Sequence, residues 1–197
     1  MNISATILAA GSSQRMGDVN KLLLPYKGKT LINLVSDTLI NSTLNPILVV
    51  TGFEHKKIAK SLPKSIDTVI YNDHWSKGIS SSINMAISAL PDNIDGNMII
   101  LGDMPLIKVK TINKLKEDFL KNNGEKIIYD YHFGKQANPV IFPKKYFNEI
   151  LLLEGDKGCK NIINQNKKKS LGVPIDSLEI IFDCDTQKDY SDLISKY

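Results

Sequence analysis

The sequence predicts an α/β fold in which helices cover both faces of a mostly parallel sheet. Short apolar runs alternate with segments of helical periodicity along the chain. The apolar runs are continuous, as in Ile47–Val50, which is typical of strands that are buried on both faces. Polar or glycine-bearing junctions follow these runs, and ligands of parallel sheets bind beyond the carboxyl ends of the strands. The sequence therefore predicts a ligand site at one edge of the sheet.

The expected elements of the first part of the chain are bounded by Pro, Gly or polar residues. Residues 3–10 form an apolar strand that ends in a Gly/Ser loop, and residues 29–44 have a helical period with Thr30 as a cap. The segments that follow have the same two patterns: strands are expected at 47–50, 68–71 and 98–101, and helices at 54–62, 79–90 and 108–120.

The last third of the chain is less regular. Strands are expected at 126–131, 140–142 and 180–182, and helices at 144–153, 158–164 and 189–197. Lys167–Lys169 is expected to be a solvated loop. The chain has 197 residues without a repeat or a low-complexity linker, which is enough for one sizeable core. A single domain that spans residues 1–197 is therefore expected.

Composition narrows the classes of function. The net charge of +4 is mild and the acidic residues are spread along the chain, so a small anionic substrate is expected and a nucleic-acid partner is not. Cys159 and Cys184 form no C-x-x-C motif, which argues for inert core thiols rather than a zinc site or a disulfide scaffold. No apolar run approaches the roughly 20 residues of a membrane span, so a cytoplasmic protein with no membrane partner is expected.

A glycine-rich loop follows the first strand and is the strongest functional signal in the sequence. Gly11, Ser12 and Ser13 leave backbone N–H groups open to a ligand, and consecutive N–H groups form an anion cradle. Arg15 and Lys21 add fixed positive charge beside this cradle. The simplest ligand for such a loop is a polyphosphate.

Arg15 supports this interpretation because it is the only arginine among 25 basic residues. Its planar guanidinium fits phosphate oxygens in a way that lysine cannot copy. The alternative is a surface arginine beside a tight turn. Gly17 is followed by Asp18, so the loop is not a Walker A motif, and the dinucleotide G-x-G-x-x-G spacing is also absent.

Three carboxylates are candidate ligands of a metal ion. Asp103 follows a predicted strand, where a carboxylate can hold Mg²⁺ together with substrate phosphates. The alternative role for Asp103 is to cap the next helix. Asp183 and Asp185 lie two residues apart at the expected end of the last strand, so both would point to one face. Either of them could complete the metal site.

Residues 72–82 form a second candidate segment, which includes the only tryptophan, Trp75. Gly78 and the serines that follow it open a helix, whose free N–H groups favour an anion or a polar ring edge. The alternative is capping by Ser80 or Ser81, with Trp75 packed in the core.

Taken in order along the whole chain, these motifs resemble those of the MobA-like nucleotidyltransferases, and most closely those of the molybdenum cofactor cytidylyltransferases. The shared segments are residues 8–17 with 20–25, 72–82, 102–106, 138–142, 155–158 and 183–186. Two positions depart from the family pattern. Asn138 replaces a small residue or histidine before Pro139 and could alter contacts with the acceptor, and Gln187 replaces a proline that follows Asp-Thr.

The resemblance implies a three-layer α/β/α Rossmann-like nucleotidyltransferase fold with a mostly parallel sheet. It implies transfer of a nucleoside monophosphate from a nucleoside triphosphate with Mg²⁺ as cofactor. It assigns catalytic roles to Arg15, Lys21 and Asp103, and the metal ion to Asp103 and Asp185. The nucleotide-binding residues that it implies, together with the strand-end junctions, are Leu8, Ala9, Ala10, Gly11, Ser12, Ser13, Arg15, Lys21, Thr51, Gly52, Asn72, Gly78 and Ser81.

The resemblance also implies the partners. Members with Leu-Ala-Ala-Gly usually use cytidine, so Ala10 favours CTP over GTP. The implied acceptor is a molybdopterin-type phosphate, and a molybdoenzyme that receives the product is a further expected partner. Three alternatives stay open: guanylyl transfer to the same cofactor, nucleotidyl transfer to another phosphorylated small molecule, and a non-catalytic molybdopterin carrier.

Overall fold

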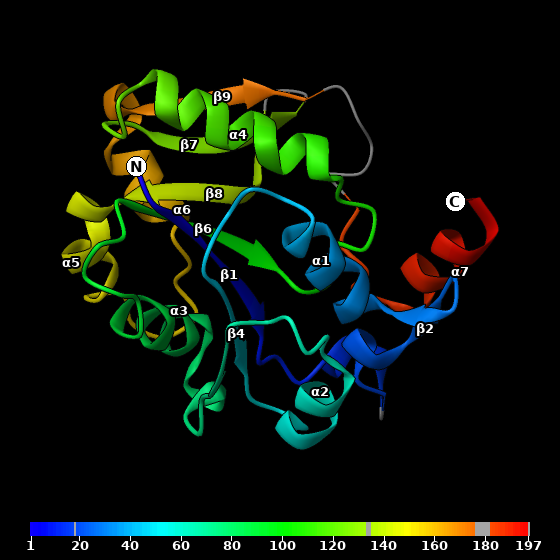
Figure 1. Ribbon diagram of the computed structural model, residues 1–197. Coiled ribbons are helices and arrows are strands. Elements are labelled where there is room, and N and C mark those ends of the chain that lie inside the picture. The colour runs from blue at the N-terminus through cyan, green and yellow to red at the C-terminus, as the bar shows by residue number, and fades with distance from the viewer. Residues whose placement is uncertain (18, 133–134, 176–181, 197) are drawn as a thin grey trace.

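A computed structural model describes residues 1–17, 19–132, 135–175 and 182–196. Its central sheet has seven strands in the order β5-β4-β1-β6-β8-β7-β9 (Figure 1). The strands are β1 (Ile3–Ala9), β4 (Ile47–Thr51), β5 (Thr68–Tyr71), β6 (Gly96–Leu101), β7 (Ile127–His132), β8 (Lys135–Pro143) and β9 (Ser170–Pro174). Only β8 runs antiparallel to its neighbours β6 and β7, and the other pairings are parallel. The prediction of a mostly parallel sheet is confirmed.

Helices form a layer on each face of this sheet (Figure 1). The helices α1 (Leu31–Ile40), α2 (His55–Ser61) and α4 (Val109–Lys121) contribute to one apolar core. The other core contains side chains of α3 (Ile79–Ser88), α5 (Phe147–Ile150) and α6 (Lys160–Gln165). Neighbouring residues of β1 reach opposite cores, Ile7 the first and Leu8 the second, as strand geometry requires. The fold is therefore the three-layer α/β/α Rossmann-like arrangement that the resemblance implied.

The prediction of a helix from residue 29 is wrong at its start, because a small hairpin comes first. The strands β2 (Pro25–Tyr26) and β3 (Lys29–Thr30) pair antiparallel, and α1 begins only at Leu31. Lys27 and Gly28, with φ of 47° and 79°, form the two-residue turn between these strands. Two consecutive left-handed residues are typical of a tight hairpin turn with the twist of the flanking strands.

Two further differences lie in the last third of the chain. The expected helix at 144–153 is shorter, with a 3₁₀ turn at Lys144–Tyr146 before α5. The edge strand β9 was not predicted, and Lys167–Lys169 is a 3₁₀ turn that leads into it. Gly172 and Pro174 weaken the strand signal of this segment, but an edge strand tolerates both residues. The expected strand at 180–182 lies mostly outside the described residues, and Phe182 itself is not in a strand.

The last helix, α7 (Gln187–Lys196), lies beside the hairpin rather than on the main sheet (Figure 1). Its Leu193 is buried in a small separate cluster with Tyr26, Leu31 and Cys184. The Tyr190 hydroxyl also donates a hydrogen bond of 2.6 Å to the backbone carbonyl of Pro25. These contacts hold the segment before α7 close to the N-terminal loop. Among the described residues, no helix is long and apolar enough to cross a membrane.

Candidate active site

A cavity of about 750 Å³ opens where β1 and β6 end. Its walls come from the N-terminal loop, the turn after β6, the start of α3 and two later loops. The lining residues are Leu8, Ala10, Gly11, Ser12, Ser13, Gln14, Arg15, Lys21, Leu22, Trp75, Ser76, Gly78, Ile79, Ser82, Leu101, Gly102, Asp103, Asp156 and Asp185. The structure thus brings the predicted phosphate loop and two predicted metal ligands to one cavity.

The glycine-rich loop is held in shape by its own polar groups. Ser13 adopts a left-handed conformation with φ of 55°, and its hydroxyl accepts a 3.1 Å hydrogen bond from the Lys21 backbone. The buried Asn20 side chain accepts a 3.1 Å hydrogen bond from the Leu22 backbone and so caps the next 3₁₀ turn. An added Cβ at Gly11 would meet no atom within 4 Å, so the backbone there faces open space. These hydrogen bonds fix the course of the loop, and the backbone at Gly11 is left open on one side.

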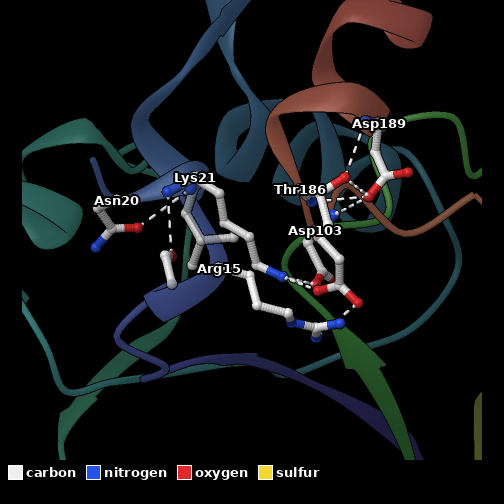
Figure 2. A network of polar contacts seen from close by, with 9 residues as sticks. Arg15, Asn20, Lys21, Asp103, Thr186 and Asp189 are labelled. Atoms are coloured by element: carbon white, nitrogen blue, oxygen red, sulfur yellow. Dashed lines mark hydrogen bonds and ion pairs between the residues drawn. The ribbon is translucent and has the colours of Figure 1, made fainter. Parts of the chain in front are cut away.

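Two cations and two carboxylates meet at one point of the cavity wall (Figure 2). The Lys21 ammonium contacts the Asp103 carboxylate and lies 2.6 Å from Oδ1 of Asp185. The Arg15 guanidinium lies 2.8 Å from Oδ2 of the same Asp185. Burial alone would lower the pKa of Lys21, but the two carboxylates outweigh it and raise this pKa above its ordinary value. Lys21 therefore stays charged at neutral pH.

Asp185, rather than Asp183, joins this group of charges. The Asp183 side chain has a buried Oδ1 without a hydrogen-bond partner in the described part of the chain. Burial, with the negative charges of Asp103 and Asp185, raises the pKa of Asp183 to about 7. Among the two aspartates, Asp185 is thus the one that pairs with Lys21 and Arg15.

Asp189 accepts a hydrogen bond from the backbone of Asp185 and so helps to position it (Figure 2). Asp189 was not among the residues predicted for the site. Its Oδ2 accepts hydrogen bonds from the backbone N–H groups of Asp185 at 3.2 Å and Thr186 at 2.7 Å, and from the Thr186 hydroxyl at 2.7 Å. Burial opposes ionisation, but these hydrogen bonds hold the pKa of Asp189 below its usual range. Thr-x-x-Asp before a helix is the signature of a capping box, and this signal could have identified Asp189.

Five residues of the predicted nucleotide-binding set do not line the cavity: Ala9, Thr51, Gly52, Asn72 and Ser81. Two of them, Asn72 and Gly52, contact residues of the wall. The buried Asn72 amide donates to the hydroxyls of Ser81 at 2.8 Å and Ser82 at 2.9 Å. A Cβ at Gly52 would lie 2.5 Å from the Cβ of Trp75, so glycine is required for the tryptophan to reach its position. Trp75 itself is only partly buried and forms part of the wall, as do Ser76 and Ser82, which were not in the predicted set.

A loop at residues 155–158 closes the cavity on the side of α3. Gly78, with φ of 107°, approaches this loop so closely that an added Cβ would lie 2.3 Å from the carbonyl carbon of Gly155. The Ser80 backbone N–H donates a 3.1 Å hydrogen bond to the Gly155 carbonyl oxygen. The close approach of the two segments places Asp156 at the cavity wall.

The substitution Gly78→Ala is expected to lower the free energy of unfolding by about 2–4 kcal/mol, because it adds both a backbone clash and an unfavourable positive φ. Urea unfolding followed by circular dichroism measures this effect. Gly158→Ala is the matched control, since a Cβ there would meet no atom within 4 Å. An equal loss in the two variants would contradict the close approach.

Neither Cys159 nor Cys184 lines the active-site cavity. Burial raises the pKa of the Cys159 thiol to about 12 and that of the Cys184 thiol to about 11. Both therefore remain protonated at neutral pH, and only a thiolate is a strong nucleophile. The expectation of inert thiols agrees with these environments.

The two carboxylates fit a divalent metal ion. Oδ1 of Asp103 is buried and has no hydrogen-bond partner among the described residues, so one carboxylate oxygen is left for a ligand. The described part of the chain has no group of three or more His, Cys, Asp or Glu that could hold a metal ion. A pair of carboxylates suits a divalent ion that takes its other ligands from waters and substrate phosphates.

Comparison with known proteins gives consistent matches. Residues 5–170 match the family described as MobA-like NTP transferase domain. The molybdenum cofactor cytidylyltransferase of Escherichia coli (strain K12) is 27% identical over 99% of this chain and 97% of its own length. The purine catabolism protein PucB of Bacillus subtilis (strain 168) is 29% identical over 81% and 80%. Among solved structures, Rv0371c of Mycobacterium tuberculosis H37Rv has a TM-score of 0.87 at 22% identity, over 98% of both chains. A structure of Rv0371c with manganese has a TM-score of 0.83 at 21% identity, over 100% of both chains.

Proposed function

We propose that this chain, which belongs to the MobA-like NTP transferase family and is a nucleotidyltransferase, transfers CMP from CTP. The proposed acceptor is the terminal phosphate of a molybdopterin-type cofactor. The observation that carries the proposal is the meeting of Arg15 and Lys21 with Asp103 and Asp185 in a cavity lined by the glycine loop. Transfer of a nucleoside monophosphate to a phosphate requires cations beside the loop that binds the phosphates, and paired carboxylates.

In the proposed reaction, an oxygen of the acceptor's terminal phosphate attacks the α-phosphorus of the triphosphate. The bond between the α-phosphorus and the bridging oxygen breaks, and pyrophosphate leaves with that oxygen. The backbone of Gly11 to Ser13 binds the triphosphate, and Lys21 and Arg15 neutralise the charge that builds on the transferring and leaving groups. The protein contributes positioning and charge, since little covalent chemistry is left to it.

Nucleotidyltransferases of this kind usually need a divalent metal, and Rv0371c has been crystallised with manganese. We propose Mg²⁺ here, held by Asp103 and Asp185. When bound, the ion supplies positive charge to the phosphates. Lys21 and Arg15 occupy the same carboxylates in the free site. These two side chains are therefore expected to move from the carboxylates to the phosphates when nucleotide and metal enter together.

Two observations favour CTP among the nucleotides. Ala10 lines the cavity where family members that use cytidine have alanine. The E. coli relative that matches almost the whole chain is named as a cytidylyltransferase of the molybdenum cofactor. These features support the choice of both base and acceptor.

The test is pyrophosphate release with Mg²⁺, molybdenum cofactor and each of CTP, GTP, ATP and UTP. Release that depends on CTP is expected. Release with GTP alone would keep the mechanism and overturn the choice of base. Binding of the cofactor without release from any triphosphate would favour a carrier, and absence of both would direct the search to other phosphorylated acceptors.

A further inference from the structure

A second, smaller pocket lies next to the active-site cavity. It has a volume of about 180 Å³ and lies among β8, α3 and α6. It shares three wall residues, Leu8, Ile79 and Leu101, with the larger cavity. The two spaces are thus neighbours, with these three side chains at their border.

The walls of this pocket are mainly apolar. Ile83, Ile99, Val140, Phe142 and Ile163 are all buried and line it. Polar groups are confined to a few positions, among them Gln136, Asn138 and Lys160. A pocket of this composition favours a ligand with apolar faces over a polyol or a sugar, whose hydroxyls would lose hydrogen bonds to water on entry.

One segment that contributes to the walls of both spaces carries a carboxylate. Asp156 lines the larger cavity, whereas Gly158, Cys159 and Lys160 line the smaller pocket. This segment is fixed to α3, because the Asn84 amide donates to the carbonyl of Leu153 at 3.1 Å in addition to the contacts of Gly155. Asp156 therefore lies in the wall of the larger cavity, two residues before the part of the segment that lines the smaller pocket, and its carboxylate can accept a hydrogen bond from a ligand.

We propose that the smaller pocket receives the body of the phosphorylated acceptor, a flat ring system with apolar faces, and that Asp156 accepts a hydrogen bond from an N–H or O–H on the edge of that ring. This inference rests on the proposed function for the position of the acceptor's phosphate. A cavity of about 150 Å³ admits a benzene-sized molecule, so the volume here suits one six-membered ring or one end of a fused system. The pocket then selects ring-bearing phosphates over acyclic polyol phosphates.

The proposal predicts which substitutions change the affinity for the acceptor but not for the nucleotide. Ala137→Leu fills the pocket from β8, where the half-buried Ala137 lines it. We expect this variant to raise both the Kd and the KM for molybdenum cofactor at least about tenfold, with the KM for CTP changed less than about twofold. Asp156→Asn removes the charge from an exposed side chain and is expected to raise the same two constants about fivefold or more.

The controls are the same substitutions at exposed positions outside both spaces. Ala89→Leu matches the first variant and Asp92→Asn the second. Circular dichroism checks the fold of each variant, and Asp156→Asn keeps the test valid if Ala137→Leu does not fold. Binding of molybdenum cofactor is measured by equilibrium dialysis without triphosphate, and turnover by pyrophosphate release.

The outcomes separate this proposal from the proposed function. In one outcome, the unchanged protein binds the cofactor but releases no pyrophosphate, and Ala137→Leu weakens the binding. This result would overturn the transferase reaction on this cofactor and would support the pocket as its binding site. A rise in the KM for CTP instead would overturn the pocket as an acceptor site and assign it to the nucleoside. Unchanged constants in both variants, failure of the unchanged protein to bind the cofactor, or equal affinity for glycerol 3-phosphate would each overturn the proposal.

Discussion

Lys21→Met is expected to lower kcat for pyrophosphate release by about a thousandfold, the loss typical of removing one preorganised group that stabilises charge in a transition state. Lys21 lies at the centre of the charged group, since its ammonium contacts both Asp103 and Asp185. Methionine keeps most of the apolar stem of the side chain and removes the ammonium group, with its charge and its hydrogen bonds to Asp103 and Asp185. Loss of rate is therefore expected with little change in the fold.

A second measurement separates the role of Lys21 from that of a metal ligand. Lys21→Met leaves the two carboxylates without their lysine, so binding of Mn²⁺ in the absence of nucleotide is expected to become tighter, while kcat falls. Lys57→Met is the matched control, because Lys57 also pairs with a carboxylate but its side chain is 68% exposed. Weaker Mn²⁺ binding in Lys21→Met, or a kcat like that of the control, would contradict the assigned role.

Asp103→Asn is expected to lower kcat/KM by about a thousandfold and to weaken the binding of a divalent ion by about tenfold or more. The amide is neutral and offers one oxygen where the carboxylate offers two. Lys21 keeps its contact with Asp185 in this variant, so the loop is expected to hold its position. Titration with Mn²⁺ and the rate of pyrophosphate release measure the two effects.

The matched control for this variant is Asp92→Asn at an exposed position. It is expected to bind Mn²⁺ and to release pyrophosphate like the unchanged protein. Normal Mn²⁺ affinity together with a lost rate in Asp103→Asn would show that this carboxylate acts on a substrate rather than on a metal ion. Normal values for both quantities would overturn the site.

The sequence was sufficient for the main sheet apart from its edge strand β9, and for the glycine loop and Asp103 at one edge of that sheet, because these features rest on local signals. A strand such as Ile47–Val50 is buried on two faces and is therefore apolar throughout. Lys21 lies in the loop that follows β1, and Asp103 lies just after the neighbouring parallel strand β6, so the parallel pairing brings both segments to the same edge of the sheet. Residues that follow the carboxyl end of a parallel strand can therefore be placed at the ligand-binding edge of the sheet from the sequence.

The features that could not be predicted depend on contacts between distant segments. That Asp185 rather than Asp183 pairs with Lys21 and Arg15 depends on the packing of the C-terminal segment against the N-terminal loop. Thr51 was expected in the nucleotide site because it ends a strand, but its hydroxyl donates to the Ile70 carbonyl at 3.0 Å and is buried. A residue at the end of a strand can point into the sheet layer or into the cavity, and the pattern of residue types does not decide between the two.

The docking of α7 on the hairpin has a consequence for how the protein loses activity. This helix is attached through a small cluster that is separate from the two main cores, and Asp185 lies just before it. Segments with few buried contacts open in partial unfolding events that leave the rest of the structure intact. Opening of α7 would withdraw Asp185 while the sheet stays folded. Inactivation at low urea should therefore precede global unfolding, and amide hydrogens of α7 should exchange faster than those of β1 and β6.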